Sequence, residues 1–333
     1  MASTSSQAPF TARAALQGTA FWTEYVVSRP KIPRAFFDII HEYHKTHGDP
    51  RSNIAHDVGT GPGNTAASLL PYFRHVVGSD INQTALDVAA KLVPDDLRSR
   101  LTFVHAAAET VADDGVLGPE LGGGGNTDLV LAGECVPLLD VPRAIAAFGR
   151  LLRPGGTLAI SFYGRPVFTS GPDPARLDAL YGRAASAISS FFQPAGDALA
   201  LQSSLATSRA LASRLNNVAL PAAEWDQVVR YHWNPDVPLC FSDPDPRSAG
   251  GEPVDRRSDG EVTHEIVDRT WWRQEWDADR IRAFLASVYP GYADRAGSVR
   301  AEIERVFDEI REALGGAKAA VSFAVVLILA TKK

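Results

Sequence analysis

The sequence predicts an α/β fold with a doubly wound, mostly parallel sheet of seven strands and a helical cap. Short apolar runs alternate with segments of helical periodicity over residues 53–164. Strands separated by helices pair in parallel through right-handed crossovers. A glycine-rich turn follows the first apolar run, and an Ala-, Leu- and Ser-rich segment with helical spacing follows the last. These features indicate an open sheet with a ligand loop at its edge and helices covering it.

The chain before residue 53 is expected to supply part of the cap. Residues 1–20 are rich in Ser, Thr and Ala, and we expect them to be mobile. Within residues 21–48, Pro33 suits the first turn of a helix, where a missing N–H does no harm, and Gly48 ends that helix. The apolar stripe of this helix consists of Phe36, Phe37, Ile39, Ile40 and Tyr43.

Five of the expected strands build a core over residues 53–164. Their sequences are NIAHDVG, HVVGSDI, LTFVHAA, TDLVLAGE and TLAISFYG. The helices between them are expected in NTAASLLPYF, in NQTALDVAAKLV with Asn82 as N-cap, and in VPRAIAAFGRLLRPGG, which Pro154 and Gly155 end.

The remaining chain is expected to complete one domain that runs from residue 21 to residue 333. WDQVVRYHWN and VSFAVVLILATKK are the other two expected strands. The other parts are a helical cap at 21–48 and 165–220, a flexible polar loop at 243–262, and terminal helices with the last strand at 277–333. Trp271, Trp272 and Trp276 are expected to pack within the cap.

Composition narrows the classes of function. The net charge is −6, which argues against nucleic acid as the main partner, because a phosphate-binding surface needs a basic excess. Two cysteines make no disulfide framework and no Cys/His spacing resembles a metal site, so we expect no metal and a cytoplasmic, reducing setting. The most apolar segment, residues 319–330, has 12 residues, whereas a helix needs about 20 to cross a bilayer. We therefore expect a buried strand there and no membrane partner.

The glycine turn DVGTGPGN matches neither of the two common phosphate-binding templates. A dinucleotide fold needs G-x-G-x-x-G, but counting from Gly59 puts Asn64 in the third position and the third glycine at Gly63. A P-loop needs a lysine that this turn lacks. Asp57, directly before the turn, would repel a pyrophosphate and attract a positively charged ligand. These features argue against the alternative of a nicotinamide-dependent oxidoreductase.

A second acidic residue, Asp80, ends the second expected strand. A carboxylate at this position can accept hydrogen bonds from both hydroxyls of a ribose. The ligand therefore carries a ribose, no pyrophosphate, and a positive centre. S-adenosylmethionine fits that description.

The motifs HDVGTGPG, VVGSDIN, FVHAAAETV, TDLVLAGE and LLRPGGTLAISF resemble, in order and spacing, those of class I S-adenosylmethionine-dependent methyltransferases. The flanking segments FWTEYVVSRPKIPRAFFDIIHEYH and VVRYHWN resemble the trans-aconitate methyltransferase group and its fungal small-molecule relatives. The resemblance implies a Rossmann-like fold, S-adenosylmethionine as cofactor and S-adenosylhomocysteine as product. It also implies a small-molecule acceptor, such as an organic acid or a secondary metabolite, and leaves the oligomeric state open.

The resemblance also implies a set of residues around the cofactor. The methionine part would lie along Asp57, Gly59, Thr60, Gly61 and Gly63, and the ribose against Asp80 with Ile81 packing on adenine. The adenine edge would meet Ala107, Ala108 and Glu109, and the methyl group would be bordered by Ala132, Gly133 and Glu134. Tyr25 and Arg29, in the pattern Y-x-x-x-R-P, would close over the cofactor.

Candidate catalytic residues are fewer, and the acceptor atom is left open. His232 could take a proton, because imidazole titrates near neutral pH, or it could be a packed strand residue. Glu134 could be a neighbour of the substrate or a surface acid. Relatives often carry His-Trp after the fourth strand, where this chain has Pro137 and Leu138. This departure keeps open an alternative in which the fold binds the cofactor but catalyses a cyclisation or rearrangement; otherwise O-methylation is favoured.

Overall fold

A single mixed sheet organises the protein. The computed structural model describes residues 9–190, 198–242, 253–292 and 297–333. In these residues nine strands pair in the order β3-β2-β1-β4-β5-β9-β6-β7, and β8 pairs with β9 off this path. The strands are β1 Ile54–Val58, β2 His75–Asp80, β3 Leu101–His105, β4 Thr127–Gly133, β5 Leu152–Phe168, β6 Trp225–Trp233, β7 Val262–Ile266, β8 Gln274–Trp276 and β9 Ala319–Lys332.

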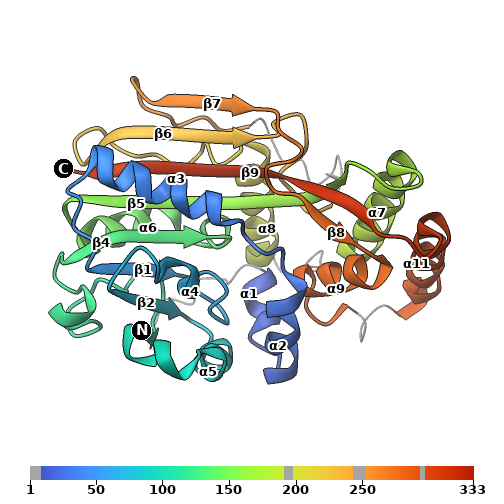
Figure 1. Ribbon diagram of the computed structural model, residues 1–333, viewed down its shortest axis with the longest axis horizontal. Coiled ribbons are helices and arrows are strands. Elements are labelled where there is room, and N and C mark those ends of the chain that lie inside the picture. The colour runs from blue at the N-terminus through green and yellow to red at the C-terminus, as the bar shows by residue number, and fades with distance from the viewer. Residues whose placement is uncertain (1–8, 191–197, 243–252, 293–296) are drawn as a thin grey trace.

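The pairing of the first five strands fixes where a ligand can bind. β1 pairs in parallel with β2 on one side and with β4 on the other. The chain order therefore reverses at β1, and in open α/β sheets ligands bind in the crevice beyond the carboxyl ends of the strands at such a reversal. β9 runs antiparallel to β5, β6 and β8. The arrowhead of β4 points towards α1 in Figure 1, so the N-terminal helices lie at this carboxyl edge.

Helices cover both faces and one end of the sheet. They are α1 Pro9–Ala14, α2 Thr19–Ser28, α3 Arg34–His47, α4 Ala66–Leu69, α5 Gln83–Leu92, α6 Val141–Leu151, α7 Pro174–Ser189, α8 Ala198–Ala212, α9 Ala278–Val288 and α11 Arg300–Leu314. Short 3₁₀ turns lie at Asp95–Arg100, Pro119–Leu121, Val136–Leu138 and Gly297–Val299. Asn82, as expected, caps α5 by accepting a hydrogen bond from the Ala85 N–H at 3.1 Å.

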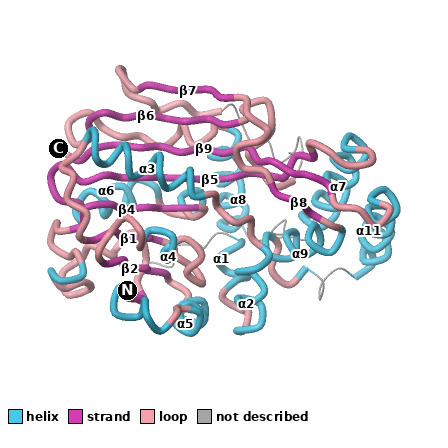
Figure 2. The backbone as a smooth tube through the Cα atoms, in the orientation of Figure 1, coloured by secondary structure: helices cyan, strands magenta, loops and turns pink. Residues whose placement is uncertain are grey.

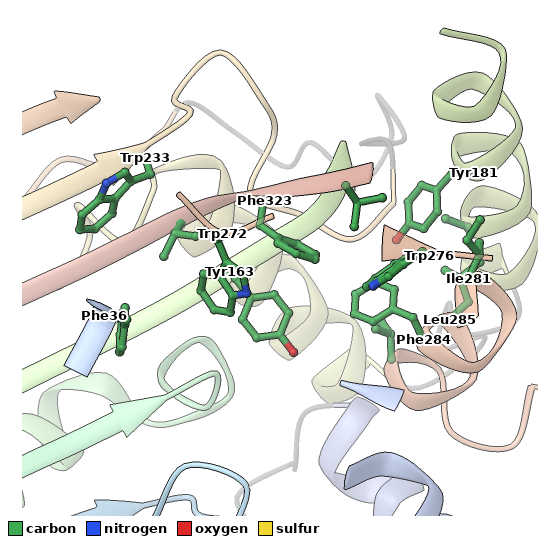
Figure 3. Packing of buried hydrophobic residues seen from close by; sticks show 14 of the residues in the cluster. Phe36, Tyr163, Tyr181, Trp233, Trp272, Trp276, Ile281, Phe284, Leu285 and Phe323 are labelled. Atoms are coloured by element: carbon green, nitrogen blue, oxygen red, sulfur yellow. The ribbon is translucent and has the colours of Figure 1, made fainter. Parts of the chain in front are cut away.

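Two apolar cores lie on the two faces of the sheet. Phe36 and Ile40 of α3 belong to the first core, together with residues of α7, α9 and α11. Phe148 of α6 and Leu211 of α8 belong to the second. In Figure 1 α3 crosses one face of the sheet while α6 and α8 lie behind it. Trp272 and Trp276 are buried in the first core, as expected for the tryptophans of the cap (Figure 3).

The predicted fold class is confirmed, and the described residues form nine strands where seven were expected. The two strands that sequence reasoning missed, β7 and β8, are 5 and 3 residues long and pair at the outer parts of β6 and β9. β5 and β9 also run beyond the point where β4 ends, and Figure 2 shows their far ends beside α7, α11 and β8. The helix expected over NTAASLLPYF shortens to α4, because Pro71 disfavours helix at the residue before it.

The two segments that were expected to be mobile or flexible, residues 1–20 and 243–262, are described only in part. Residues 1–8 of the segment expected to be mobile lie outside the described residues, and α1 begins at Pro9. Residues 243–252 of the loop expected to be flexible also lie outside them. The rest of that loop is held in place: the Val254 N–H donates to Ser213 Oγ at 2.8 Å, and Glu261 forms a buried ion pair with Arg230.

Candidate functional site

The glycine turn lies between β1 and α4, at the reversal point of the sheet. Gly59, Gly61 and Gly63 have φ angles of +71°, +54° and +83°, a region that residues with a Cβ rarely adopt. A Cβ on Gly59 would lie 2.8 Å from Cys135 Cβ, and one on Gly63 would lie 3.2 Å from Ala89 Cβ. A Cβ on Gly61 would meet no protein atom within 4 Å. Gly59 and Gly63 are therefore needed for packing, whereas Gly61 borders open space that a ligand can fill.

Asp57 braces this turn from within. Its Oδ2 accepts a hydrogen bond from Thr60 Oγ1 at 2.7 Å, and the side chain is buried. Burial raises the pKa of Asp57 to about 7, and the nearby Asp80 carboxylate adds to the rise. Burial thus disfavours the ionised form of Asp57, and a positively charged ligand nearby would stabilise that form.

Asp80 ties the end of β2 to the same turn. Its Oδ2 accepts from the Gly61 N–H at 2.8 Å, and its Oδ1 accepts from the Asn82 N–H at 2.8 Å. Burial raises its pKa, against the effect of these backbone hydrogen bonds. Ile81, the next residue, is 47% exposed and forms an apolar surface beside the carboxylate. A carboxylate and an exposed apolar side chain are suited to a ribose and an adenine ring, respectively.

The loop after β3 borders this region. Ala108 is buried, and the Ala107 carbonyl accepts a hydrogen bond from the Thr110 N–H at 3.1 Å. Glu109 Oε1 accepts from the Asp140 N–H at 3.0 Å, so its carboxylate holds the start of α6. Glu109 therefore has a structural role, and its expected contact with the adenine edge stays a prediction.

Glu134 follows directly after Ala132 and Gly133 at the end of β4. Its φ of 62° is left-handed, which is uncommon for a residue with a side chain. Oε1 accepts a hydrogen bond from the Tyr163 N–H at 2.7 Å, while Oε2 is buried and has no partner among the described residues. Burial raises the pKa of Glu134 to about 8, although the Arg29 charge opposes the rise. The site thus holds a carboxyl oxygen that is free to take a proton from a bound ligand.

Tyr25 and Arg29 lie on and directly after α2, which covers the crevice. The Arg29 guanidinium lies 4.7 Å from the centre of the Tyr25 ring, and its Nη1 donates to Tyr163 Oη at 3.1 Å. Burial raises the pKa of Tyr25, and the charges of Glu134 and Asp80 add to it. α2 lies beside the glycine turn, since Asn64 of the turn donates a hydrogen bond to the Val26 carbonyl of α2.

The end of α2 and the residues after it are anchored to the rest of the molecule by three hydrogen bonds. Asn64 Nδ2, in the glycine turn, donates to the Val26 carbonyl at 3.3 Å. Arg280 Nη2 of α9 donates to the Arg29 carbonyl at 2.9 Å, and Trp272 Nε1 donates to the Lys31 carbonyl at 3.0 Å. These contacts fix the carboxyl end of α2 and the residues that follow it against the glycine turn, α9 and Trp272.

His232 lies away from this group. In β6 it pairs with Val326 of β9, which in turn pairs with Phe162 of β5, so three strand spacings, about 14 Å, separate it from the line of β4. It is buried, and burial lowers its pKa to about 4, with Arg214, Arg230 and Arg257 lowering it further. The structure therefore brings together the expected cofactor residues and Glu134, but not His232.

Sequence reasoning missed the aromatic residues that enclose Arg29. The Arg29 guanidinium lies 6.0 Å from the ring centre of Tyr163, 5.5 Å from Phe241 and 5.9 Å from Phe284. Tyr163 lies within the expected strand TLAISFYG, and nothing in its local pattern marks it as a site residue. Only the pairing of strands far apart in sequence brings these rings to one place.

The arrangement suits a cofactor with an amino-acid end and a positive sulfur. Glu134 Oε2 is a buried acceptor without a partner, and Arg29 Nε is a buried donor without one among the described residues. An O–H or N–H group of a ligand would satisfy the first, and a carboxylate would satisfy the second. The described residues contain no group of three His, Cys, Asp or Glu side chains that could hold a metal ion, and in them no helix is long and apolar enough to span a membrane.

Comparisons with known proteins show what the chain is similar to. Residues 56–160 match a family model described as "Methyltransferase domain". The chain is 48% identical to methyltransferase ptaI of Pestalotiopsis fici, over 98% of this chain and 97% of that protein. It is 35% identical to methyltransferase pgmE of Aspergillus terreus, over 94% and 93% of the two chains. Among solved structures, one assigned as a type II methyltransferase from Anaeromyxobacter dehalogenans aligns with a TM-score of 0.54 and 18% identity, covering 90% of this chain and 97% of that one.

Proposed function

Because this chain belongs to the S-adenosylmethionine-dependent methyltransferases, we propose that it methylates an oxygen atom of a small-molecule acceptor, with Glu134 as the base. Its cofactor is S-adenosylmethionine and the product is S-adenosylhomocysteine. When bound, the cofactor supplies a methyl group that its sulfonium activates for transfer. The family membership argues against a nicotinamide-dependent oxidoreductase. What we propose beyond family membership is the acceptor atom, an oxygen, and the roles of individual residues.

The proposed cofactor contacts follow the geometry of the crevice. The open space at Gly61 takes the methionine part, and Asp80 with Ile81 takes the ribose and adenine. Ala107, Ala108 and Glu109 border the adenine edge from the loop after β3. Tyr25 and Arg29 cover the methionine part. The Arg29 guanidinium can donate hydrogen bonds to the carboxylate of that methionine part. Gly59, Gly63, Asp57 and Thr60 hold the turn in the shape that this requires.

The observation that carries the O-methylation proposal is the unpartnered Glu134 Oε2. A hydroxyl is a weak nucleophile until its proton is taken, and a base works best when its pKa lies near the working pH. The Glu134 pKa of about 8 meets that condition, whereas His232, with a pKa of about 4, is a weak base and lies apart. In the proposed step Glu134 Oε2 would take the hydroxyl proton as the hydroxyl oxygen bonds to the methyl carbon. The bond from that carbon to sulfur would break at the same time, and its electron pair would stay on the sulfur of S-adenosylhomocysteine.

The charges of the site also support the proposal. Asp57, Asp80 and Glu134 all have raised pKa values, mainly through burial. A positive ligand would favour the ionised form of each acid. Binding of the sulfonium would thus help to ionise Glu134 just where a base is needed. Methyl transfer removes that positive charge, which would weaken binding of the product.

A mass-spectrometric assay tests this function. The purified protein is incubated with S-adenosylmethionine and a pool of small hydroxyl-bearing metabolites, and both the acceptor and S-adenosylhomocysteine are followed. We expect a gain of one methyl group on an acceptor oxygen with one S-adenosylhomocysteine released per methyl. A product rearranged without a methyl gain, and without S-adenosylhomocysteine, would instead support the cyclisation or rearrangement alternative.

A further inference from the structure

Tyr163 is hydrogen-bonded to two ionisable side chains of the site, Arg29 and Glu134. Its hydroxyl oxygen accepts a hydrogen bond from Arg29 Nη1 at 3.1 Å, and its backbone N–H donates to Glu134 Oε1 at 2.7 Å. Arg29 follows α2, Glu134 follows β4, and Tyr163 lies in β5. A single residue of the sheet therefore links two groups that reach the site from different elements.

The Tyr163 ring has little freedom to move. It is 4% exposed and packs against Trp272 at 5.4 Å, Phe323 at 5.8 Å and Phe241 at 6.1 Å between ring centres. Its backbone is fixed by pairing with Val325 of β9. Figure 3 shows the ring beside Trp272 and Phe323 with its hydroxyl directed away from β9. The hydroxyl oxygen is thus a fixed point in a packed core.

Arg29 depends on a fixed point of this kind. Its other near neighbours are the faces of the Tyr25, Phe241 and Phe284 rings, at 4.7, 5.5 and 5.9 Å from the guanidinium carbon. Contacts between a cation and an aromatic face are attractive but set the orientation of the guanidinium only loosely. A hydrogen bond to a fixed oxygen sets it directly, because the planar guanidinium presents its N–H groups in a rigid fork.

We propose that Tyr163 is a positioning residue whose hydroxyl holds the Arg29 guanidinium towards the cofactor carboxylate and whose N–H holds the Glu134 carboxyl. The proposal rests on the proposed function, which places Arg29 and Glu134 in the site. It assigns separate roles to two parts of Tyr163: the side-chain hydroxyl supports cofactor binding through Arg29, and the backbone N–H orients the base Glu134. A change of side chain alone should therefore disturb the first and spare the second.

The variant Tyr163→Phe separates the two roles, since it removes the hydroxyl and keeps the N–H. We expect about tenfold weaker binding of S-adenosylhomocysteine, the order of effect of a lost hydrogen bond to a charged group. The KM for S-adenosylmethionine should rise by a similar factor, while kcat at saturating cofactor changes by about twofold or less. The midpoint of the pH profile of kcat should stay at the wild-type value, because Glu134 keeps its hydrogen bond.

Isothermal titration with S-adenosylhomocysteine is the direct test, on wild type, Tyr163→Phe, Arg29→Gln and the double variant. If Tyr163 acts through Arg29, the double variant binds as weakly as Arg29→Gln and no weaker. The matched control is Tyr43→Phe, which removes another buried hydroxyl, bonded to the Gln227 carbonyl at 2.7 Å and remote from the crevice. It should lose stability without losing affinity. Tyr163→Met, which also fills the site without a hydroxyl, serves if Tyr163→Phe fails to fold.

Two results would overturn the proposal: wild-type affinity in Tyr163→Phe, or effects of the two single variants that add fully in the double variant. A shifted pH midpoint in Tyr163→Phe would contradict the separate roles of side chain and backbone. Failure of the proposed function has a different signature. Wild type would then bind S-adenosylhomocysteine, and the titrations would keep their meaning, but no hydroxyl acceptor would gain a methyl group.

Discussion

Replacing Glu134 by glutamine tests the proposed base with little change in shape. The amide oxygen of Glu134→Gln can still accept the Tyr163 N–H, but the side chain has no carboxylate to take a proton. Burial raises the pKa of Glu134 from 4.5 to about 8, a difference of 8 − 4.5 = 3.5. At about 1.36 kcal/mol per pKa unit, ionising this acid costs about 5 kcal/mol more than in water.

The pH dependence follows from the direction of this shift. The base must be ionised to work, and at pH 7 an acid of pKa about 8 is ionised in only about one molecule in ten. The value of kcat/KM for the acceptor should therefore rise about tenfold for each pH unit below the pKa of Glu134 in the cofactor complex, which the sulfonium lowers from about 8, and level off above that pKa. In Glu134→Gln the value should be about 100- to 10,000-fold lower at the plateau, and this rise should disappear.

The assay is the initial rate of S-adenosylhomocysteine release between about pH 6 and about pH 9, with subsaturating acceptor. Glu275→Gln, which alters an exposed acid of β8 paired with Arg273, is the matched control and should keep the wild-type profile. Wild-type rates and an unchanged profile in Glu134→Gln would refute the reasoning. The acceptor would then be ionised before it binds, or another group would take its proton.

Three further outcomes are expected. The affinity for S-adenosylmethionine relative to S-adenosylhomocysteine should rise with pH through about 7 to 8, as Asp57 and Glu134 ionise and favour the sulfonium; titrations in which the ratio stays constant would contradict this. Gly61→Ala and Gly59→Ala should both lower the melting temperature through their left-handed backbone, and Gly59→Ala should lower it further, because its methyl would also meet Cys135; equal melting temperatures would count against this packing. Glu261→Gln should lower the free energy of unfolding by about 3 kcal/mol by leaving a buried arginine without its carboxylate, and a denaturant titration that shows no loss would contradict it.

The glycine turn could be predicted from sequence because local rules determine it. Three alternating glycines after a strand require left-handed backbone, and each of the three has it. Asp57 and Asp80 end neighbouring parallel strands, so their proximity follows from the predicted topology alone. The core strands were likewise predictable from their alternation with helices, and the N-cap at Asn82 from its place before a helix.

The surroundings of the acceptor could not be predicted in the same way. Tyr163 meets Arg29 across 134 residues of sequence, through the parallel pairing of β4 with β5 and the position of α2. The backbone at Glu134 turns left-handed although glutamate shows no such preference. The position of His232 depends on the order of the strands between β4 and β6, and this order cannot be predicted from the local sequence pattern of β6. The short strands β7 and β8 form only because longer neighbours offer them an edge.

The most direct test of the central claim is where the methyl group goes. The protein is incubated with S-adenosylmethionine carrying a ¹³C-labelled methyl group and with the acceptor found by mass spectrometry, and the product is examined by ¹³C NMR. We predict a single labelled resonance in the O-methyl region, with one S-adenosylhomocysteine formed per label. A label attached to nitrogen, carbon or sulfur, or turnover of the acceptor without any label, would contradict the proposed O-methylation.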